Sequence, residues 1–308
     1  MATDAKLGIL VPGGFGGAPP TLAEYSAFFR RAEELGYDSL WVIDRIFHPN
    51  NIIDPMTLLA CAATVTQRVR LGTSVLLFVL RHPVLVAKTT ATLDYLSGGR
   101  VTLGISLGGR DNEFGPLGVD VRRRVSRFNE GLEVMRRLWS ERDVTHHGRY
   151  YSMDNVNIDP KPVQQPSIPI IIGGSADTAL QRAAEHTDGW VAGGAASPEV
   201  FAQAWGKIRD YAAAAGKNPD ALDSSKLIYT YVDADRDRAK RELKSFTHAY
   251  YGPQYDVENA CAFGRPEDCA AKLQAYIDAG AKTVMVGPTW PDPAQIERIS
   301  AEVAPLLR

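Results

Sequence analysis

The run Gly173-Gly174-Ser175-Ala176-Asp177-Thr178 combines residue types that can hold an anion. Two glycines follow the apolar residues Ile170–Ile172 and precede a segment with helical periodicity, Ala176–Glu185. Glycines let a backbone approach a ligand closely, and the free N–H groups at a helix N-terminus bind phosphate. The hydroxyls of Ser175 and Thr178 add hydrogen-bond donors. The run therefore predicts a phosphate-binding turn; the alternative is a tight turn in which Ser175 or Asp177 caps the helix.

Further candidates follow other apolar runs. Arg45 and His48 come after Ser39–Ile43, where a charged or titratable side chain could serve catalysis, and the alternative for Arg45 is a surface salt bridge. Ser74 and Val75 end the LGTSV stretch, where plain packing is the alternative. The run Ser106-Leu107-Gly108-Gly109 ends another apolar stretch, and its glycines either leave room for a flat ligand or turn the chain.

Other chemical patterns do not occur in the sequence. It has no HExxH, GxSxG or Walker motif, and no GxGxxG after the first apolar run. His146 and His147 are adjacent, so in an extended segment they point to opposite faces. Cys61, Cys261 and Cys269 show no metal-binding spacing. We therefore expect no metal site, and we interpret Gly13–Gly17 as a flexible loop over the site.

The elements that must position these residues alternate between short β-rich runs and amphipathic stretches. The predicted strands are Lys6–Val11, Ser39–Ile43, Val69–Leu77, Val101–Ser106, Ile170–Ile172, Gly189–Ala192, Leu227–Val232 and Thr283–Val286. The predicted helices are Thr21–Leu35, Met56–Val65, Val84–Leu96, Arg122–Trp139, Ala176–Glu185, Pro198–Ala215, Arg236–Thr247, Arg265–Ala279 and Pro293–Leu306.

Two segments interrupt this alternation. Tyr150–Pro169 contains four prolines and no helical period, which indicates an inserted excursion after the fourth helix. Tyr250–Phe263 is irregular and predicts a mobile loop before the eighth strand.

Eight strand–helix alternations favour an α/β fold, a (β/α)8 TIM barrel that occupies residues 1–308 as one domain. A doubly wound open sheet is the alternative. Active sites of such barrels lie at the C-terminal ends of the strands, where all the candidate residues above fall.

The composition excludes several other classes of protein. The chain has 308 residues and a net charge of −2, with 34 basic and 36 acidic side chains, so nothing indicates a nucleic-acid or anionic-membrane partner. Arg122, Arg123 and Arg124 are interpreted as a solvated helix face rather than a phosphate-binding patch. The N-terminus has no apolar signal segment and no run is long enough to span a membrane, so we expect a cytoplasmic protein.

Five stretches, taken together and in this order, resemble the luciferase-like monooxygenase superfamily of flavin and deazaflavin enzymes. They are AEELGYDSLWVIDR (32–45), VRLGTSVLLFVLRHPVLVAKTTATLDYLSGGRVTLGISLGG (69–109), EFGPLGVDVRRRVSRFNEGLEVMRRLW (113–139), PKPVQQPSIPIIIGGS (160–175) and GRPEDCAAKLQAYIDAGA (264–281). The family fold is a (β/α)8 barrel, which agrees with the strand count.

The resemblance implies a set of cofactor-binding residues. Ser74-Val75 matches a bulge with a non-proline cis peptide behind the cofactor ring, Ser106 matches a position beside the isoalloxazine, and Gly108 keeps that wall open. Ser175 and Thr178, with Gly173 and Gly174 before them, match the residues that hold the flavin phosphate in luciferases.

The sequence also departs from the family pattern. Arg45 stands where members commonly have a histidine, and an arginine is a poor general base, so Arg45 is assigned to anion binding and His48 to acid–base chemistry. Leu107 replaces a basic phosphate ligand. Gly109 stands near the acid that transfers a proton in a sugar-phosphate dehydrogenase branch, which argues against that activity.

The resemblance implies an oxidoreductase that uses either coenzyme F420, for hydride transfer, or reduced FMN, for oxygen insertion with a flavin reductase as partner. A homodimer is also implied. Aromatic residues at Phe15, Phe78, Tyr250-Tyr251 and Trp290 indicate a small apolar or aromatic substrate. The alternative is a non-catalytic flavin-binding barrel subunit, which the arginine at position 45 would suit.

Overall fold

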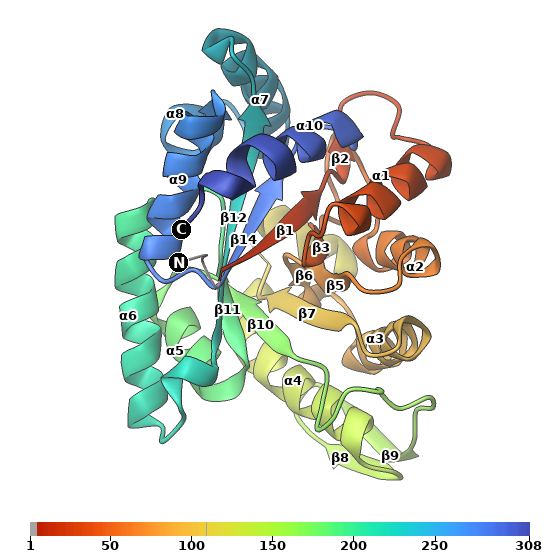
Figure 1. Ribbon diagram of the computed structural model, residues 1–308. Helices are drawn as coiled ribbons and strands as arrows, with labels where there is room; N and C mark the ends of the chain where they lie inside the picture. The colour runs from red at the N-terminus through yellow and green to blue at the C-terminus, as the bar shows by residue number, and fades with distance from the viewer. Residues whose placement is uncertain (1–4, 109) are drawn as a thin grey trace.

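The computed structural model describes residues 5–108 and 110–308, and within them eight parallel strands form a closed barrel (Figure 1). The strands are β1 (Lys6–Val11), β3 (Ser39–Val42), β5 (Arg70–Thr73), β7 (Val101–Ser106), β10 (Ile170–Gly173), β11 (Gly189–Ala192), β12 (Asp223–Val232) and β14 (Thr283–Gly287). Closure comes from the parallel pairing of β7 with β10, in which Ile170 lies opposite Leu103. The predicted (β/α)8 barrel is confirmed, and the open-sheet alternative is wrong.

Helices surround the barrel. They are α1 (Leu22–Glu34), α2 (Pro55–Val65), α3 (Pro83–Ser97), α4 (Arg124–Ser140), α5 (Asp177–His186), α6 (Pro198–Ala214), α7 (Arg236–Tyr251), α8 (Val257–Ala260), α9 (Pro266–Asp278) and α10 (Pro293–Arg298). Helix α1 begins with the predicted capping box, in which Thr21 accepts from the Glu24 amide and Glu24 accepts from the Thr21 amide. Among the described residues, no helix is both long and apolar enough to cross a lipid bilayer.

Short helical turns and strands complete the chain. The turns are η1 (Phe78–Leu80), η2 (Asp111–Glu113), η3 (Gly115–Leu117), η4 (Val121–Arg123), η5 (Pro219–Ala221), η6 (Ile299–Val303) and η7 (Ala304–Leu306). The short strands are β2 (Gly14–Phe15), β4 (Asn51–Ile52), β6 (Leu76–Leu77), β8 (Val144–His147), β9 (Ser152–Val156) and β13 (Ala262–Gly264).

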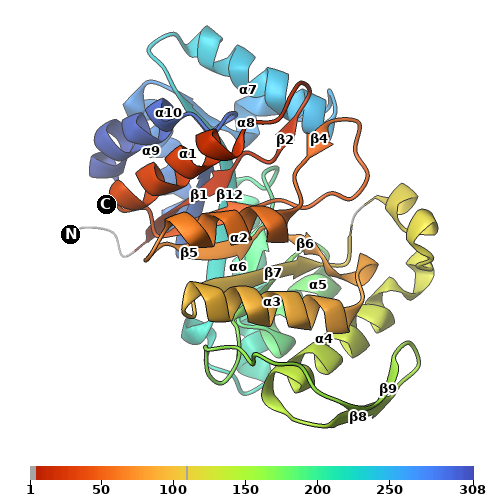
Figure 2. The ribbon, with the colours of Figure 1, turned by 90° about the vertical axis from the view of Figure 1, so that its right-hand side faces the viewer.

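Several predicted boundaries need correction. The predicted third strand is broken after Thr73, and its end, β6, pairs with β7 instead of continuing in β5. The excursion begins inside an antiparallel hairpin, because β9 pairs with β8 on the outer side of α4 (Figure 2). The predicted last helix divides into α10, η6 and η7, since Pro305 has no amide hydrogen to continue the helical bonding.

The segment predicted as an irregular, mobile loop, Tyr250–Phe263, is largely regular, although residues 252–256 and Cys261 lie outside helices and strands. Tyr250 and Tyr251 form the last turn of α7, α8 follows, and β13 pairs in parallel with β12. Tyr250 is buried against Phe246, whose ring stacks on it at 6.2 Å. Sequence periodicity missed this arrangement because two helices separated by only a few residues leave no long amphipathic pattern.

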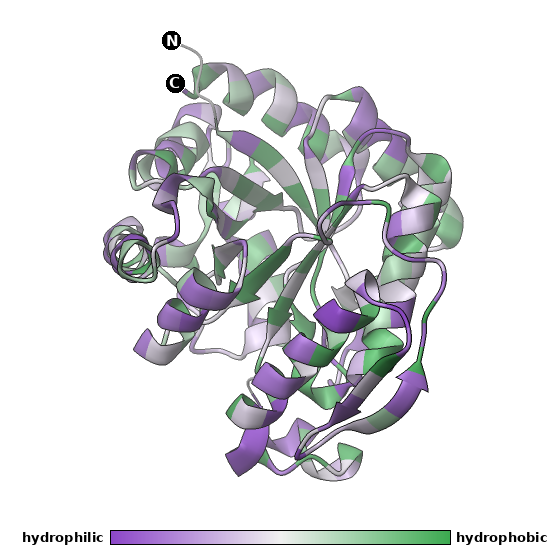
Figure 3. Cartoon of the chain, turned by 90° about the horizontal axis from the view of Figure 1, so that it is seen from below, coloured by the Kyte–Doolittle hydropathy of each residue, from purple (hydrophilic) through white to green (hydrophobic). Residues whose placement is uncertain are grey.

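The barrel interior is filled by a large side chain that lies between two glycines. Trp41 on β3 is buried, and its indole nitrogen donates to Ser39 at 2.8 Å. A Cβ atom at Gly72, on the neighbouring strand β5, would lie 2.3 Å from the Trp41 ring, and one at Gly8 on β1 would lie 3.0 Å from the indole nitrogen. Viewed from below, the apolar strand positions gather inside the ring of helices (Figure 3). Glycine on both flanking strands is therefore what lets Trp41 fill this layer.

We expect Gly72→Ala to destabilise the protein by about 1–3 kcal/mol, because the added methyl overlaps the buried Trp41 ring and the core must shift. Urea unfolding monitored by circular dichroism measures the change. Gly206→Ala in α6 is the matched control, since nothing lies within 4 Å of its added Cβ and the helix should gain roughly 0.5–1 kcal/mol. Equal unfolding midpoints for the two variants would show that Trp41 tolerates the methyl group.

Candidate functional site

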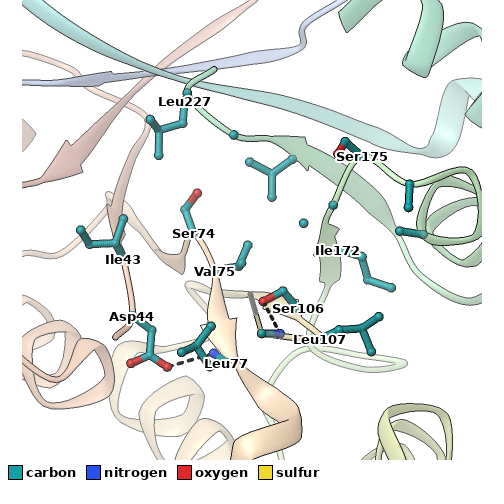
Figure 4. Close-up of a pocket in the computed structure, with 18 of the residues that line it drawn as sticks. Ile43, Asp44, Ser74, Val75, Leu77, Ser106, Leu107, Ile172, Ser175 and Leu227 are labelled. Atoms are coloured by element: carbon teal, nitrogen blue, oxygen red, sulfur yellow. Dashed lines mark hydrogen bonds between the residues drawn. The ribbon is translucent and has the colours of Figure 1, made fainter. Parts of the chain in front are cut away.

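A cavity of about 430 Å³ opens at the carboxyl ends of the barrel strands. Seven of the predicted cofactor residues line it, together with Arg45; the seven are Ser74, Val75, Ser106, Gly108, Gly173, Gly174 and Ser175. Figure 4 shows the side chains of Ser74, Val75, Ser106 and Ser175 around the cavity. Thr178 and His48 are described residues that do not line the cavity. The barrel thus brings together segments from β3, β7, β10 and the β5–β6 junction, which are far apart in the sequence.

The junction between β5 and β6 carries a cis peptide bond between Ser74 and Val75, which confirms the geometry that the resemblance implied. Val75 fits there because the neighbouring strands offer glycines. A Cβ at Gly104 on β7 would lie 3.2 Å from the Val75 side chain, and a Cβ at Gly173 on β10 would lie 3.0 Å from it. The apolar Val75 side chain therefore forms part of the cavity wall in space that two glycines leave free.

Asp44 fixes the end of β3 against this junction. Its buried carboxylate accepts from the Leu77 amide at 2.9 Å and from the Arg81 guanidinium at 2.9 Å. Burial raises the pKa of Asp44, while the Arg81 charge and the Leu77 amide act in the opposite direction. Figure 4 shows the Asp44–Leu77 bond at the edge of the cavity. Asp44 is thus occupied by Arg81 and leaves the neighbouring Arg45 to another partner.

Arg45 pairs with Glu113 of η2, which lies in the loop after β7. The Nη1–Oε2 distance is 3.4 Å, Glu113 is fully buried, and the Arg45 side chain is 17% exposed. Among the described residues, neither the Arg45 Nε nor the Glu113 Oε1 has a hydrogen-bond partner. Arg45 therefore pairs with a buried acid and does not form the surface salt bridge of the alternative. It also lines the cavity, and anion binding by Arg45 stays a prediction.

His48 lies beside the cavity wall, behind Tyr250. Its Nδ1 accepts from the Asn50 amide at 3.0 Å, so Nε2 carries the proton and donates to the Tyr250 carbonyl at 3.0 Å. The imidazole also stacks on the Tyr250 ring at 5.0 Å. Tyr250 itself lines the cavity, and Arg110 donates to the same carbonyl at 3.1 Å. These contacts hold Tyr250 in place.

The predicted phosphate turn lies on the opposite side of the cavity from Asp44. Gly174 has a φ of +149°, and Ser175 follows it into the cavity wall. The N-cap of α5 is Ala176, not Ser175 or Asp177, and no side chain caps the helix. The Asp177 carboxylate instead accepts from Lys207 at 2.7 Å and from Tyr211 at 2.9 Å. The amides of the first turn of α5 are therefore left without a side-chain cap, as an anion site requires.

Two arginines that line the cavity were missed by the sequence analysis. Arg182 on α5 is 8% exposed, donates to Asn129 at 3.1 Å and lies over the Phe128 ring, and burial lowers its pKa. Arg124 at the start of α4 also lines the cavity. The solvated-face interpretation fits Arg122 and Arg123, which pair with Asp120. It fits Arg124 in part, because the Arg124 side chain is 41% exposed and pairs with Asp111 at 3.8 Å but also lines the cavity. The spacing of Ala179 and Arg182, both cavity residues one helical turn apart, was the available signal.

The aromatic residues predicted to face the substrate lie in three different parts of the structure. Tyr250 and Tyr251 line the cavity, whereas Phe15 and Trp290 line a second pocket of about 300 Å³. Phe78 is buried against Phe128 at 5.5 Å. Gly109 lies outside the described residues.

Comparison with known proteins identifies relatives over nearly the whole chain. The family model described as luciferase-like monooxygenase matches residues 5–259. An F420-dependent glucose-6-phosphate dehydrogenase of Kineococcus radiotolerans is 30% identical over 322 residues, covering 94% of each protein.

Solved structures share the fold. An F420-dependent secondary alcohol dehydrogenase in complex with an F420–acetone adduct has a TM-score of 0.87 at 23% identity, covering 100% of both chains. The oxygenating constituent of 3,6-diketocamphane monooxygenase from Pseudomonas putida, in complex with FMN, has a TM-score of 0.84 at 21% identity, covering 100% of this chain and 99% of that one. The chain therefore belongs to the luciferase-like monooxygenase family of oxidoreductases.

Proposed function

We propose that the chain, acting as one domain, binds F420 in this cavity and catalyses an oxidation–reduction on a small apolar or aromatic organic substrate. The observation that carries the proposal is the make-up of the cavity wall. The wall offers the Ser175 hydroxyl and the guanidinium groups of Arg124 and Arg182, and the remainder is mostly apolar. This arrangement suits a ligand with a phosphate at one end and a planar ring at the other.

The residues present fit a flavin-type ring. Gly108, Gly173 and Gly174 leave backbone in the wall where a side chain would fill space, and a Cβ at Gly108 would already meet Phe114 at 3.2 Å. Ile43, Val75, Ile172, Val191 and Leu227 supply apolar surface around this gap. The arginines supply the basic groups that Leu107 lacks, so phosphate binding does not depend on backbone amides and hydroxyls alone.

The choice of F420 rests on the relatives that match most of the chain, because the dehydrogenase that matches 94% of it is named for that cofactor. Reduced FMN, delivered by a partner reductase, is the second candidate, since Ser175 lines the cavity where the resemblance puts a flavin phosphate ligand. When bound, F420 would supply hydride transfer and reduced FMN would supply oxygen activation.

The chain's own residues would then bind and orient the substrate. Arg45 projects a permanent positive charge into the cavity and can hold a carboxylate or another anion in a forked pair. Tyr250 and Tyr251 add aromatic surface that excludes water. Both ring nitrogens of His48 are engaged, which supports a role in holding Tyr250 over the acid–base role that the sequence analysis assigned to it.

A binding and turnover experiment tests the function. Tryptophan fluorescence should be quenched saturably by F420, and F420 should be reduced in the presence of a member of a panel of small aromatic and aliphatic alcohols. Glucose 6-phosphate belongs in the panel as a compound that we expect to be inactive, because Gly109 stands in place of the acid. Binding of F420 without any turnover, including oxygenation with reduced FMN, would favour the non-catalytic subunit.

The same titration tests the phosphate end of the cavity. Ser175→Ala removes one hydrogen bond to a charged group, so the Kd should rise roughly ten-fold. Ser167→Ala is the control, because this serine donates to the Ile168 carbonyl and lies outside the cavity wall. A Kd that is unchanged in Ser175→Ala for both cofactors contradicts the phosphate assignment.

Arg45→Ala should lower kcat/KM by about 1–2 orders of magnitude, since it removes a charged contact from a largely desolvated site. The Kd of the cofactor should change much less. Arg45→Lys retains the charge but not the forked geometry and should recover only part of the loss. If Arg45→Ala and His48→Ala both turn over like the parent protein, neither residue acts on the substrate.

We also propose that the chain forms a homodimer through α3 and its neighbour α2. Leu85, Tyr95 and Leu96, all on α3, are 66%, 57% and 69% exposed, and α2 lies beside α3 on the same face of the barrel (Figure 2). Exposed apolar groups of this kind indicate an association surface.

Light scattering should give twice the monomer mass for the parent protein and the monomer mass for Leu85→Glu. Burial of a charged side chain in the interface is unfavourable, whereas burial of the leucine stabilises the dimer. Leu22→Glu, at a leucine on α1 that is 62% exposed, is the control and should leave the mass unchanged. A parent protein that is monomeric at all concentrations removes this proposal.

A further inference from the structure

Lys226 is a fully buried lysine that the proposed chemistry does not use. It lies in β12 with no exposed surface. Its Nζ donates to three backbone carbonyls, those of Gly193 at 2.7 Å, Gly194 at 3.1 Å and Leu227 at 2.7 Å. No carboxylate is paired with it among the described residues. A buried ammonium held only by carbonyl groups is costly unless it orders something that the fold needs.

The carbonyls that Lys226 holds belong to the cavity wall. Gly193 and Gly194 follow β11 and both line the cavity, opposite the Ser74–Val75 junction. A Cβ at Gly194 would lie 2.5 Å from the Tyr255 hydroxyl, and the Tyr255 ring stacks on Tyr251, which also lines the cavity. The glycine pair has no side chains of its own to anchor it. Its position therefore depends on the groups that bind its backbone.

A second contact supports the same turn. Tyr276 on α9 donates to the Ala196 carbonyl at 2.7 Å, and its ring lies 4.9 Å from the Lys226 Nζ. Lys226 and Tyr276 thus hold the residues from Gly193 to Ala196 together from the outer side of the barrel, away from the cavity.

We propose that Lys226 is a positioning residue that fixes the Gly193–Gly194 wall of the cofactor cavity through three N–H···O=C bonds. Only the protonated ammonium has three donors, and a neutral amine has two, so deprotonation releases one carbonyl of the wall. This inference rests on the proposed function, because it assigns the wall to cofactor binding.

Lys226 titrates near neutral pH, whereas the thiol and the phenols that surround it do not. Burial, together with the nearby charge of Lys272 on α9, lowers the pKa of Lys226 to about 7, while Cys261 acts in the opposite direction. The Cys261 thiol faces Lys226, but burial raises the pKa of that thiol to about 12, so it is uncharged at neutral pH. Burial likewise raises the pKa of Tyr276 to about 12 and raises the pKa of Tyr255. Cofactor affinity should therefore fall as pH rises through the pKa of Lys226.

The variant Lys226→Met keeps the length of the side chain and removes its donors. Its Kd for F420 and FMN, from fluorescence titration at pH 6, should exceed that of the parent protein by at least about ten-fold. The difference should shrink at pH 8.5, where the parent protein has lost the third donor. Any titration of the cofactor itself is common to both proteins and cancels in this ratio.

Lys217→Met is the matched control. Lys217 also donates to three carbonyls, those of Ala184, Glu185 and Thr187, but these lie at the opposite end of β11 from the cavity. Its Kd should equal that of the parent protein at both pH values, whatever its thermal stability. Equal Kd values for Lys226→Met and Lys217→Met overturn the inference. A parent protein that binds neither cofactor overturns the proposed function instead.

A measurement on the parent protein covers the case in which Lys226→Met does not fold. Binding that favours the protonated lysine must, by linkage, raise the pKa of that lysine in the complex. With 13Cε-labelled lysine, NMR should show one lysine resonance whose chemical shift titrates near neutral pH. The midpoint of that titration should move to higher pH when cofactor is added. A resonance that titrates identically with and without bound cofactor shows that Lys226 does not position the wall for it.

Discussion

The pairing of β7 with β10 is the constraint on which the site depends. It joins strands separated by the whole of α4, the hairpin and the excursion, with Ile170 opposite Leu103 and Ile172 opposite Ile105. Because this register closes the barrel, the cavity gains one wall from the first half of the chain and another from the second. The same register brings Gly104 and Gly173 close to Val75, since a Cβ at these positions would lie 3.2 Å and 3.0 Å from that side chain.

Glycines determine both the packing of the barrel interior and the wall of its cavity. In the interior, Gly8 and Gly72 leave the space that Trp41 fills, so the barrel is packed at that level. Towards the carboxyl ends, Gly173, Gly174, Gly193 and Gly194 line the cavity with backbone. An open wall made of glycine backbone has little intrinsic rigidity, since glycine gives up more conformational freedom than any other residue on folding. Asp44 anchors the β5–β6 junction from the edge of the cavity, and Lys226 anchors the turn after β11 from outside it.

Charge is divided along the cavity. Arg182 lies on α5, the helix that follows Ser175, and Arg45 follows Asp44. Arg124 lies at the start of α4, where it pairs with Asp111 at 3.8 Å. Arg45 pairs with the fully buried carboxylate of Glu113, so the Arg45 guanidinium stays near the wall. At an Nη1–Oε2 distance of 3.4 Å, Glu113 neutralises the Arg45 charge only in part. The arrangement allows a phosphate at one end and an anionic or polar substrate group at the other, with Tyr250 and Tyr251 closing the apolar space between them.

The sequence by itself determined the order of strands and helices, the capping box of α1, the (β/α)8 fold and the glycine-rich turn after Ile172, because these depend on local periodicity and turn chemistry. It also placed Ser74, Ser106 and Ser175 at strand ends, which in a barrel share one face. Only the tertiary structure decided which neighbours they have. The pairing of Arg45 with Glu113, the entry of Arg124 and Arg182 into the cavity and the exclusion of Thr178 and His48 depend on long-range packing and on side-chain direction. The helical ending of α7 at Tyr251 was decided in the same way, since burial of Tyr250 against Phe246 overrides a weak local pattern.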